Sequence, residues 1–93
     1  MMERAAFEQA RDQLDAILAP RKFRLAQEVY NHASFGSKLA VWSRRGGSMR
    51  LVWDGREDML LLEVQADEIW EALFVGTASD AAQVAAAAER HLA

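Results

Sequence analysis

Hydrophobic positions near the start of the chain recur at the spacing of a helix. Between residues 2 and 19 the apolar side chains fall at steps of three or four, and the charged side chains fall mostly between them. Pro20 is the only proline and disfavours helical geometry at the residue before it. We therefore predict an amphipathic helix over residues 2–19. Its apolar stripe consists of Phe7, Ala10, Leu14, Ile17 and Leu18.

The spacing of apolar residues changes from helical to alternating after Pro20. Four alternating stretches are separated by turn residues, a pattern that predicts four antiparallel strands joined as a meander. Residues 31–33 form the first predicted turn. The segment Arg45-Gly46-Gly47 fits a three-residue hairpin loop, and residues 55–58 fit a four-residue loop. The strands are marked by Phe23, Leu25 and Val29, then by Phe35, Leu39 and Val41, then by Met49, Leu51 and Trp53, and finally by Leu60, Leu62 and Val64.

The helical pattern returns beyond Gln65. Residues 67–74 fit a short helix that Gly76 would end, and residues 81–92 have strong helix propensity behind an N-cap at Ser79. The order α-β-β-β-β-α-α predicts an α+β fold, with a four-stranded antiparallel meander and the N-terminal and C-terminal helices packed on one face. With 93 residues, of which 52% are hydrophobic and 27% charged, the chain fits a single domain spanning residues 1–93.

Loop lengths fix which side chains share a face of the sheet. The three-residue loop places Val41 opposite Leu51 and Leu39 opposite Trp53. All the strand markers above then share one face, provided that Val29 pairs with Phe35. Each of these side chains stabilises the fold by roughly 1.5–3 kcal/mol when fully buried, so we predict that this face is the core.

The same register assigns a second set of side chains to the open face of the sheet, with Trp42 beside Arg50. A two-residue turn at Gly46-Gly47 is the alternative, and we disfavour it because it would bring Lys38 and Ala40 to the core side. The predicted cross-strand pairs are Arg50 with Glu63, Lys38 with Asp54, Ala40 with Val52, and Val52 with Leu61.

Composition and charge restrict the class of protein. The net charge of −3 provides no global attraction for nucleic acid or for an acidic membrane. The absence of cysteine excludes disulfides and thiolate chemistry, and it suits a reducing compartment. Residues 1–14 carry charges throughout, unlike a secretory signal. The longest uncharged apolar run, residues 72–79, is far shorter than the roughly 20 residues of a membrane-spanning helix. We expect a cytoplasmic protein.

The sequence shows no constellation of catalytic or metal-ligating residues. His32 and His91 have no carboxylate or cysteine at ligand spacing. There is no Gly-x-Ser-x-Gly motif, and residues 45–48 lack the Gly-Lys-Ser/Thr ending of a phosphate-binding loop. We therefore expect a non-enzymatic protein without a cofactor. An enzyme or ligand-binding domain with a pocket between the sheet and residues 70–74 remains the alternative.

The open face of the predicted sheet is the best candidate for function. An apolar centre rimmed by charge is typical of a protein interface, including self-association into a homodimer. Basic and aromatic groups on a sheet also resemble platforms for single-stranded nucleic acid, here through Arg24, Lys38, Trp42 and Arg50. A third interpretation is a solvated face whose charges pair among themselves. The candidate partner-binding residues are Lys38, Trp42, Arg50, Val52 and Leu61.

Residues 23–64 resemble a pattern found in small uncharacterised bacterial α+β proteins. The matching residues are Phe23-Arg24, Tyr30, Phe35-Gly36 and the segment from Arg50 to Arg56. Some proteins with this pattern are regarded as immunity-type partners of bacterial toxins. The resemblance covers less than half of the chain and brings no catalytic residues. It implies a protein-binding role. We therefore predict a small non-enzymatic protein-binding module, immunity-like or chaperone-like, that acts through the open face of the sheet.

Overall fold

The computed structural model of the chain describes residues 2–31 and 36–93. The strands form one antiparallel sheet in the order β1-β2-β3-β4-β5. The predicted α+β meander is confirmed, but with five strands in place of four. The elements are α1 (Met2–Leu18), η1 (Ala19–Arg21), β1 (Arg24–Asn31), β2 (Ser37–Arg44), β3 (Gly47–Asp54), β4 (Met59–Ala66), β5 (Ile69–Gly76), η3 (Ala78–Asp80) and α2 (Ala81–Leu92).

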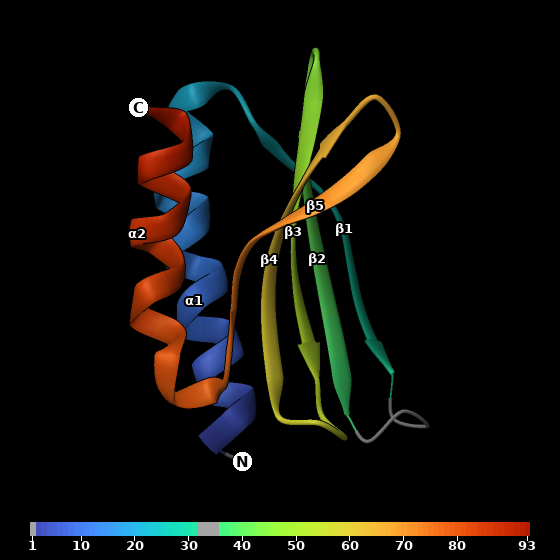
Figure 1. The fold of residues 1–93 in the computed structure, drawn as a ribbon, viewed down its shortest axis with the longest axis vertical. Coiled ribbons are helices and arrows are strands. Elements are labelled where there is room, and N and C mark those ends of the chain that lie inside the picture. The colour runs from blue at the N-terminus through green and yellow to red at the C-terminus, as the bar shows by residue number, and fades with distance from the viewer. Residues whose placement is uncertain (1, 32–35) are drawn as a thin grey trace.

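Both α-helices lie on the same side of the sheet (Figure 1). They run in the same direction and pack against each other, with α1 contacting β2 and α2 contacting β4 and β5. The opposite side of the sheet, which we call the open face, is covered by no helix. The core lies between the helices and the sheet. Its largest fully buried side chains are Phe7, Leu14, Leu18, Trp42, Met49, Leu51, Leu60, Leu62 and Val84.

The helices begin and end close to the predicted residues. The apolar stripe of α1 is confirmed at four of its five positions, where the side chains are buried, and Ile17 is half-buried. The N-cap predicted at Ser79 was wrong, because Asp80 is the N-cap residue of α2. Thr77 is the N-cap residue of the preceding turn η3, and its backbone N–H donates to the carboxylate of Asp80 at 2.9 Å. Neither helix in the described part of the chain has the length and apolar character needed to cross a membrane.

Residues 69–76 form a strand where the sequence predicted a helix. Asp67 and Glu68 have φ angles of 53° and 69°, which makes them the two central residues of a tight hairpin turn. Such turns usually contain Asn-Gly. Asp67-Glu68 lacks this signature, so the sequence did not indicate a turn here. Leu73 is an extra residue on β5 that has no register partner, and both Leu73 and Phe74 pack on the core. This β-bulge removes the alternation by which a strand is recognised.

The turn between β2 and β3 contains two residues, not three. Arg44 pairs with Gly47, which leaves Arg45 and Gly46 at the centre of the turn. Gly46 has a φ of 92°, a conformation that glycine adopts without steric cost. A shift of one residue exchanges the two faces of a strand. The side-chain assignments predicted for the two faces of β2 are therefore reversed.

The reversal changes both the core and the open face. Ala40 and Trp42 are fully buried on the helix side, whereas Leu39 and Val41 lie on the open face. The predicted core positions of Leu39 and Val41 were wrong. The predicted pairs of Lys38 with Asp54 and of Ala40 with Val52 were also wrong, because Lys38 pairs with Trp53 and Leu39 with Val52.

The predictions for the other hairpins are partly confirmed. The four-residue loop of residues 55–58 is confirmed, as are the pairs Arg50–Glu63 and Val52–Leu61 and the burial of Trp53. Val29 pairs with Leu39 rather than with Phe35. Val29 and Leu25 are about two-fifths exposed, so neither belongs to the core. The side chain of Phe35 and the predicted turn at residues 31–33 lie outside the part of the chain whose side chains are described.

Candidate functional site

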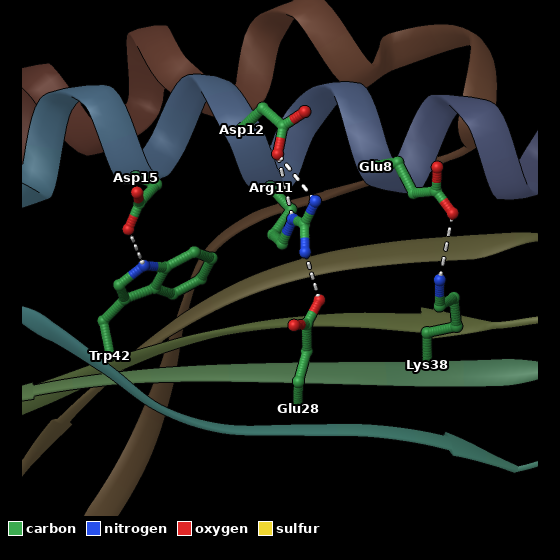
Figure 2. A network of polar contacts seen from close by, with 7 residues as sticks. All are labelled: Glu8, Arg11, Asp12, Asp15, Glu28, Lys38 and Trp42. Carbon is green, nitrogen blue, oxygen red and sulfur yellow. Dashed lines mark hydrogen bonds and ion pairs between the residues drawn. The ribbon is translucent and has the colours of Figure 1, made fainter.

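The side chain of Trp42 is enclosed beneath α1 on the helix-covered side of the sheet. Its indole nitrogen donates a hydrogen bond to Oδ1 of Asp15 across 3.0 Å (Figure 2). Buried tryptophans need a partner for this N–H group, and the position of Asp15 on α1 provides one. Because Trp42 has no exposed surface, it cannot contact a partner at the open face. Its predicted place there was wrong.

The side chain of Lys38 also lies on the helix-covered side, near the start of β2. Its ammonium group is 3.4 Å from a carboxylate oxygen of Glu8, as Figure 2 shows. The same group lies 5.2 Å from the ring centre of Phe7 and 5.5 Å from that of Tyr30. Only 11% of the Lys38 side chain is exposed. Lys38 is therefore occupied in holding α1 to the sheet, and its ammonium group lies on the helix side.

Arg11 completes a row of polar contacts between α1 and the sheet. It forms ion pairs with Glu28 of β1 at 2.6 Å and with Asp12 at 2.7 Å (Figure 2). Partial burial lowers the pKa of Arg11, while hydrogen bonds to Glu28 and Asp12 raise it, and the net pKa is raised. Residues 8, 11 and 15 follow each other at helical steps, so one stripe of α1 faces β1 and β2 with polar groups.

The open face carries an aliphatic side chain from each of the five strands. Each of these residues is the register partner of the next one across the sheet. A sheet with one face in water normally presents polar side chains on that face. Here an apolar strip crosses the open face from one edge strand to the other. We call this set the aliphatic row: Val29, Leu39, Val52, Leu61 and Val75.

Charged and aromatic side chains flank the aliphatic row. The Nε of Arg50 donates a hydrogen bond to Glu63 on the neighbouring strand at 2.7 Å. The guanidinium carbon of Arg50 also lies 4.0 Å from the ring centre of Trp70 on β5, a cation–π contact. The predicted position of Trp42 beside Arg50 was wrong, and Trp70 is the tryptophan that contacts Arg50. Arg50 and Glu63 neutralise each other beside the row.

Part of the open face is accessible and slightly hollowed. The two ends of the aliphatic row, Val29 and Val75, are 42% and 58% exposed. A shallow depression of about 410 Å³ covers the half of the row that lies on β1, β2 and β3. A partner with a matching apolar surface could therefore reach the row directly. The depression is lined by Val29, Ser37, Lys38, Leu39, Arg50, Val52, Trp53 and Asp54.

The structure brings together three of the five predicted partner-binding residues. Arg50, Val52 and Leu61 share the open face, whereas Lys38 and Trp42 lie on the other side. Sequence reasoning missed several members of this surface. Strand β2 carries apolar residues at both odd and even positions, so alternation could not choose its outer face. Val75 was missed because it directly follows residues 67–74, which were predicted to form a helix. The missed residues are Val29, Leu39, Trp70 and Val75.

The basic and aromatic platform predicted for nucleic acid does not form as one surface. Trp42 is buried, and Lys38 contacts Glu8 on the helix side. Arg50 is on the open face but is bonded to Glu63. Among the described aromatic residues, Trp70 stacks with a basic side chain there. Arg24, at the start of β1, is exposed and pairs with Ser43 on the open face.

A second hollow lies at the end of the molecule where α2 finishes. Its volume is about 360 Å³. Apolar and charged side chains contribute to it from the β2–β3 and β4–β5 hairpins, from Phe23 and from the end of α2. Among the described residues there is no group of three or more histidine, aspartate or glutamate side chains arranged to hold a metal ion. The side chains that characterise this end cavity are Phe23, Met49, Val64 and Leu92, with Arg44, Arg45, Glu71 and His91.

Comparison with known proteins adds no relative to this description. No protein-family model, curated protein or solved structure matches the chain significantly.

Proposed function

We propose that this protein is a non-enzymatic protein-binding module that acts through the open face of its sheet. The observation that carries the proposal is the aliphatic row, which crosses all five strands without a polar interruption. Apolar surface removed from water contributes about 25 cal/mol per Å². A contiguous apolar strip on the exposed side of a sheet is therefore a surface that gains from being covered.

The charges around the row favour a protein over a nucleic acid as the partner. Arg50 is paired with Glu63, so the centre of the face has no excess positive charge. Nucleic-acid binding draws most of its affinity from basic groups that neutralise phosphates. A neutral face with an apolar centre and a charged rim is instead the usual anatomy of a protein interface. Immunity-like or chaperone-like binding is the kind of activity that such a face supports.

The edges of the sheet are less suited to binding than its face. The two edge strands, β1 and β5, each contain an extra residue that breaks their ladder, at Ala26 and at Leu73. Bulges on edge strands are a recognised device against the addition of another strand. A partner is therefore expected to pack on the side chains of the open face rather than to extend the sheet.

Photocrosslinking in the cells that produce the protein tests the proposal. A photoreactive amino acid replaces Leu61 in the aliphatic row, and in a matched variant it replaces Glu89, an exposed residue of α2. We expect a protein adduct from position 61 and none from position 89. Mass spectrometry of the adduct distinguishes a second copy of the chain from another protein. Absence of any adduct at position 61, with the protein folded, contradicts the proposal.

The end cavity supports a second candidate function, the binding of a small amphipathic anion. Two arginines, Arg44 and Arg45, stand beside apolar side chains in a hollow of about 360 Å³. Arg44 lies 4.3 Å from the ring centre of Phe23 and donates to the carbonyl of Arg21, so its position is fixed. A ligand with an aromatic body and an anionic head would match both parts of the cavity.

Titration with 8-anilinonaphthalene-1-sulfonate tests this second candidate. The fluorescence of this probe rises in an apolar site, and its sulfonate can pair with arginine. We expect saturable binding that is lost in the double variant Arg44→Ala/Arg45→Ala and retained in Leu61→Lys, which alters the open face. Binding that disappears in Leu61→Lys and persists in the double variant would place the probe on the open face and remove the support for an end-cavity ligand.

A further inference from the structure

We propose that the occupant of the open face is a second copy of this chain, packed so that the two aliphatic rows run along each other. This inference rests on the proposed binding function of the open face and adds the identity and orientation of the partner.

Opposite charges stand on the two sides of the row at the middle of the sheet. Strand β3 is the central strand, and Val52 is its contribution to the aliphatic row. Arg50 and Asp54 lie two residues before and two residues after Val52, so all three share the open face. Arg50, with its partner Glu63, therefore stands on one side of the row, and Asp54 stands on the other.

A two-fold axis that runs along the row would make these charges complementary. Such an axis turns the second copy over so that its Arg50 faces Asp54 of the first copy, and the same contact occurs a second time by symmetry. The Nε of Arg50 is used by Glu63, but a guanidinium carries five N–H donors, so Arg50 retains capacity for a second carboxylate. The aliphatic rows then meet side chain to side chain.

A two-fold axis that runs along β3 would give the opposite result. It would place Asp54 of one copy against Asp54 of the other, with no opposite charge between them. Juxtaposed like charges oppose association, and the alignment along the row avoids them. The two orientations also differ at the ends of the row. With the axis along the row each valine at an end meets its own counterpart, whereas with the axis along β3 Val29 meets Val75.

The size of the face limits the strength of the dimer. The molecule measures 33 × 23 × 19 Å, and the sheet and helices are layered along the intermediate dimension (Figure 1). The remaining two dimensions bound a face of roughly 600 Å², somewhat below the roughly 800 Å² per partner of a standard interface. Face-to-face sheets pack with their strands within about 30° of each other. We expect a dimer that dissociates on dilution.

Sedimentation over a concentration series measures the self-association. We expect the wild-type protein to change from monomer to dimer as its concentration rises. Val52→Glu, which introduces a charge at the centre of the row, should remain a monomer, while Glu89→Lys on α2 should behave as the wild type. Asp54→Asn retains the side-chain acceptor that binds the backbone N–H of Arg56 but removes the charge, and it should raise the dissociation constant at least threefold. Circular dichroism of each variant establishes that it is folded.

Single cysteines determine the orientation, because the chain contains no natural cysteine. Val75→Cys alone, and Val29→Cys alone, should each give a covalent dimer with a short bis-maleimide. An equimolar mixture in which one variant carries an isotope label should give few mixed dimers of Val29→Cys with Val75→Cys. The predominance of mixed dimers would overturn the proposed axis.

The remaining outcomes separate this inference from the proposed function. A wild-type protein that stays monomeric at every concentration overturns self-association. If photocrosslinking at position 61 then captures a different protein, the binding function of the open face stands without the dimer. If the wild type dimerises and folded Val52→Glu dimerises equally well, the open face is not the interface and the inference fails.

Discussion

The indole nitrogen of Trp42 on β2 and the carboxylate of Asp15 on α1 form a hydrogen bond of 3.0 Å across the interface between sheet and helix. This contact joins a fully buried tryptophan to a residue that is exposed on the surface of α1. It holds the helix layer on one side of β2. The other side of the same strand therefore supplies Leu39 and Val41 to the open face.

Replacement of Trp42 by phenylalanine should lower the free energy of unfolding by about 1.5–3 kcal/mol. The change removes a hydrogen bond to a charged group and leaves a small cavity beside α1. Urea denaturation followed by circular dichroism measures the effect. The matched control is Trp70→Phe on the half-exposed open face, for which we expect a loss below about 1 kcal/mol. Equal losses at both positions would contradict the buried position of Trp42.

The hairpin between β4 and β5 should gain stability from glycine at position 68. Glu68 has a φ of 69°, which strains a residue that has a Cβ atom, and glycine adopts this angle freely. We expect Glu68→Gly to raise the free energy of unfolding by about 0.5–1 kcal/mol. Glu71→Gly, in the middle of β5, should lower it by a similar amount. Destabilisation by glycine at both positions to the same extent would indicate a helix in this segment.

A methyl group at position 76 should not fit. A Cβ atom on Gly76 would lie 2.7 Å from the ring of Phe74 and 2.7 Å from a carboxylate oxygen of Asp80. We expect Gly76→Ala to lower the free energy of unfolding by about 1–3 kcal/mol, because Phe74 packs on the core and must shift. At Gly47 the nearest atom would be the carbonyl oxygen of Gln65, at 3.7 Å. Gly47→Ala should accordingly lower the free energy of unfolding much less. Thermal unfolding of both variants and the wild type measures the difference.

The ion pair between Arg11 and Glu28 should contribute little and should depend on salt. Their side chains are 27% and 37% exposed, so solvent screens the attraction between them. A double-mutant cycle with Arg11→Met and Glu28→Gln should yield a coupling energy of about 0.2–1 kcal/mol at low ionic strength. At 1 M salt the coupling should fall towards zero. A coupling that is unchanged by salt would require a more buried pair than the structure shows.

The candidate site was partly predictable because the hairpin between β3 and β4 has an informative turn. The four-residue loop at residues 55–58 fixed the pairing of β3 with β4, and with it the positions of Arg50, Val52 and Leu61 on one face. Trp70 could not be assigned, because its strand begins after a turn without glycine or asparagine. The bulge at Leu73 then gave the segment two adjacent core contacts, a feature shared with a helix.

The sequence by itself determined the fold class, the extent of both helices and the core faces of β3 and β4. These features follow from local periodicity, which depends only on the spacing of apolar residues along the chain. The tertiary structure decided which side of β2 is buried. Both sides of that strand are apolar, and the choice depends on a hydrogen bond between residues 15 and 42 and on an ion pair between residues 8 and 38. Contacts between residues so distant in the chain leave no periodic signal, so the aliphatic row becomes apparent only when all five strands are in register.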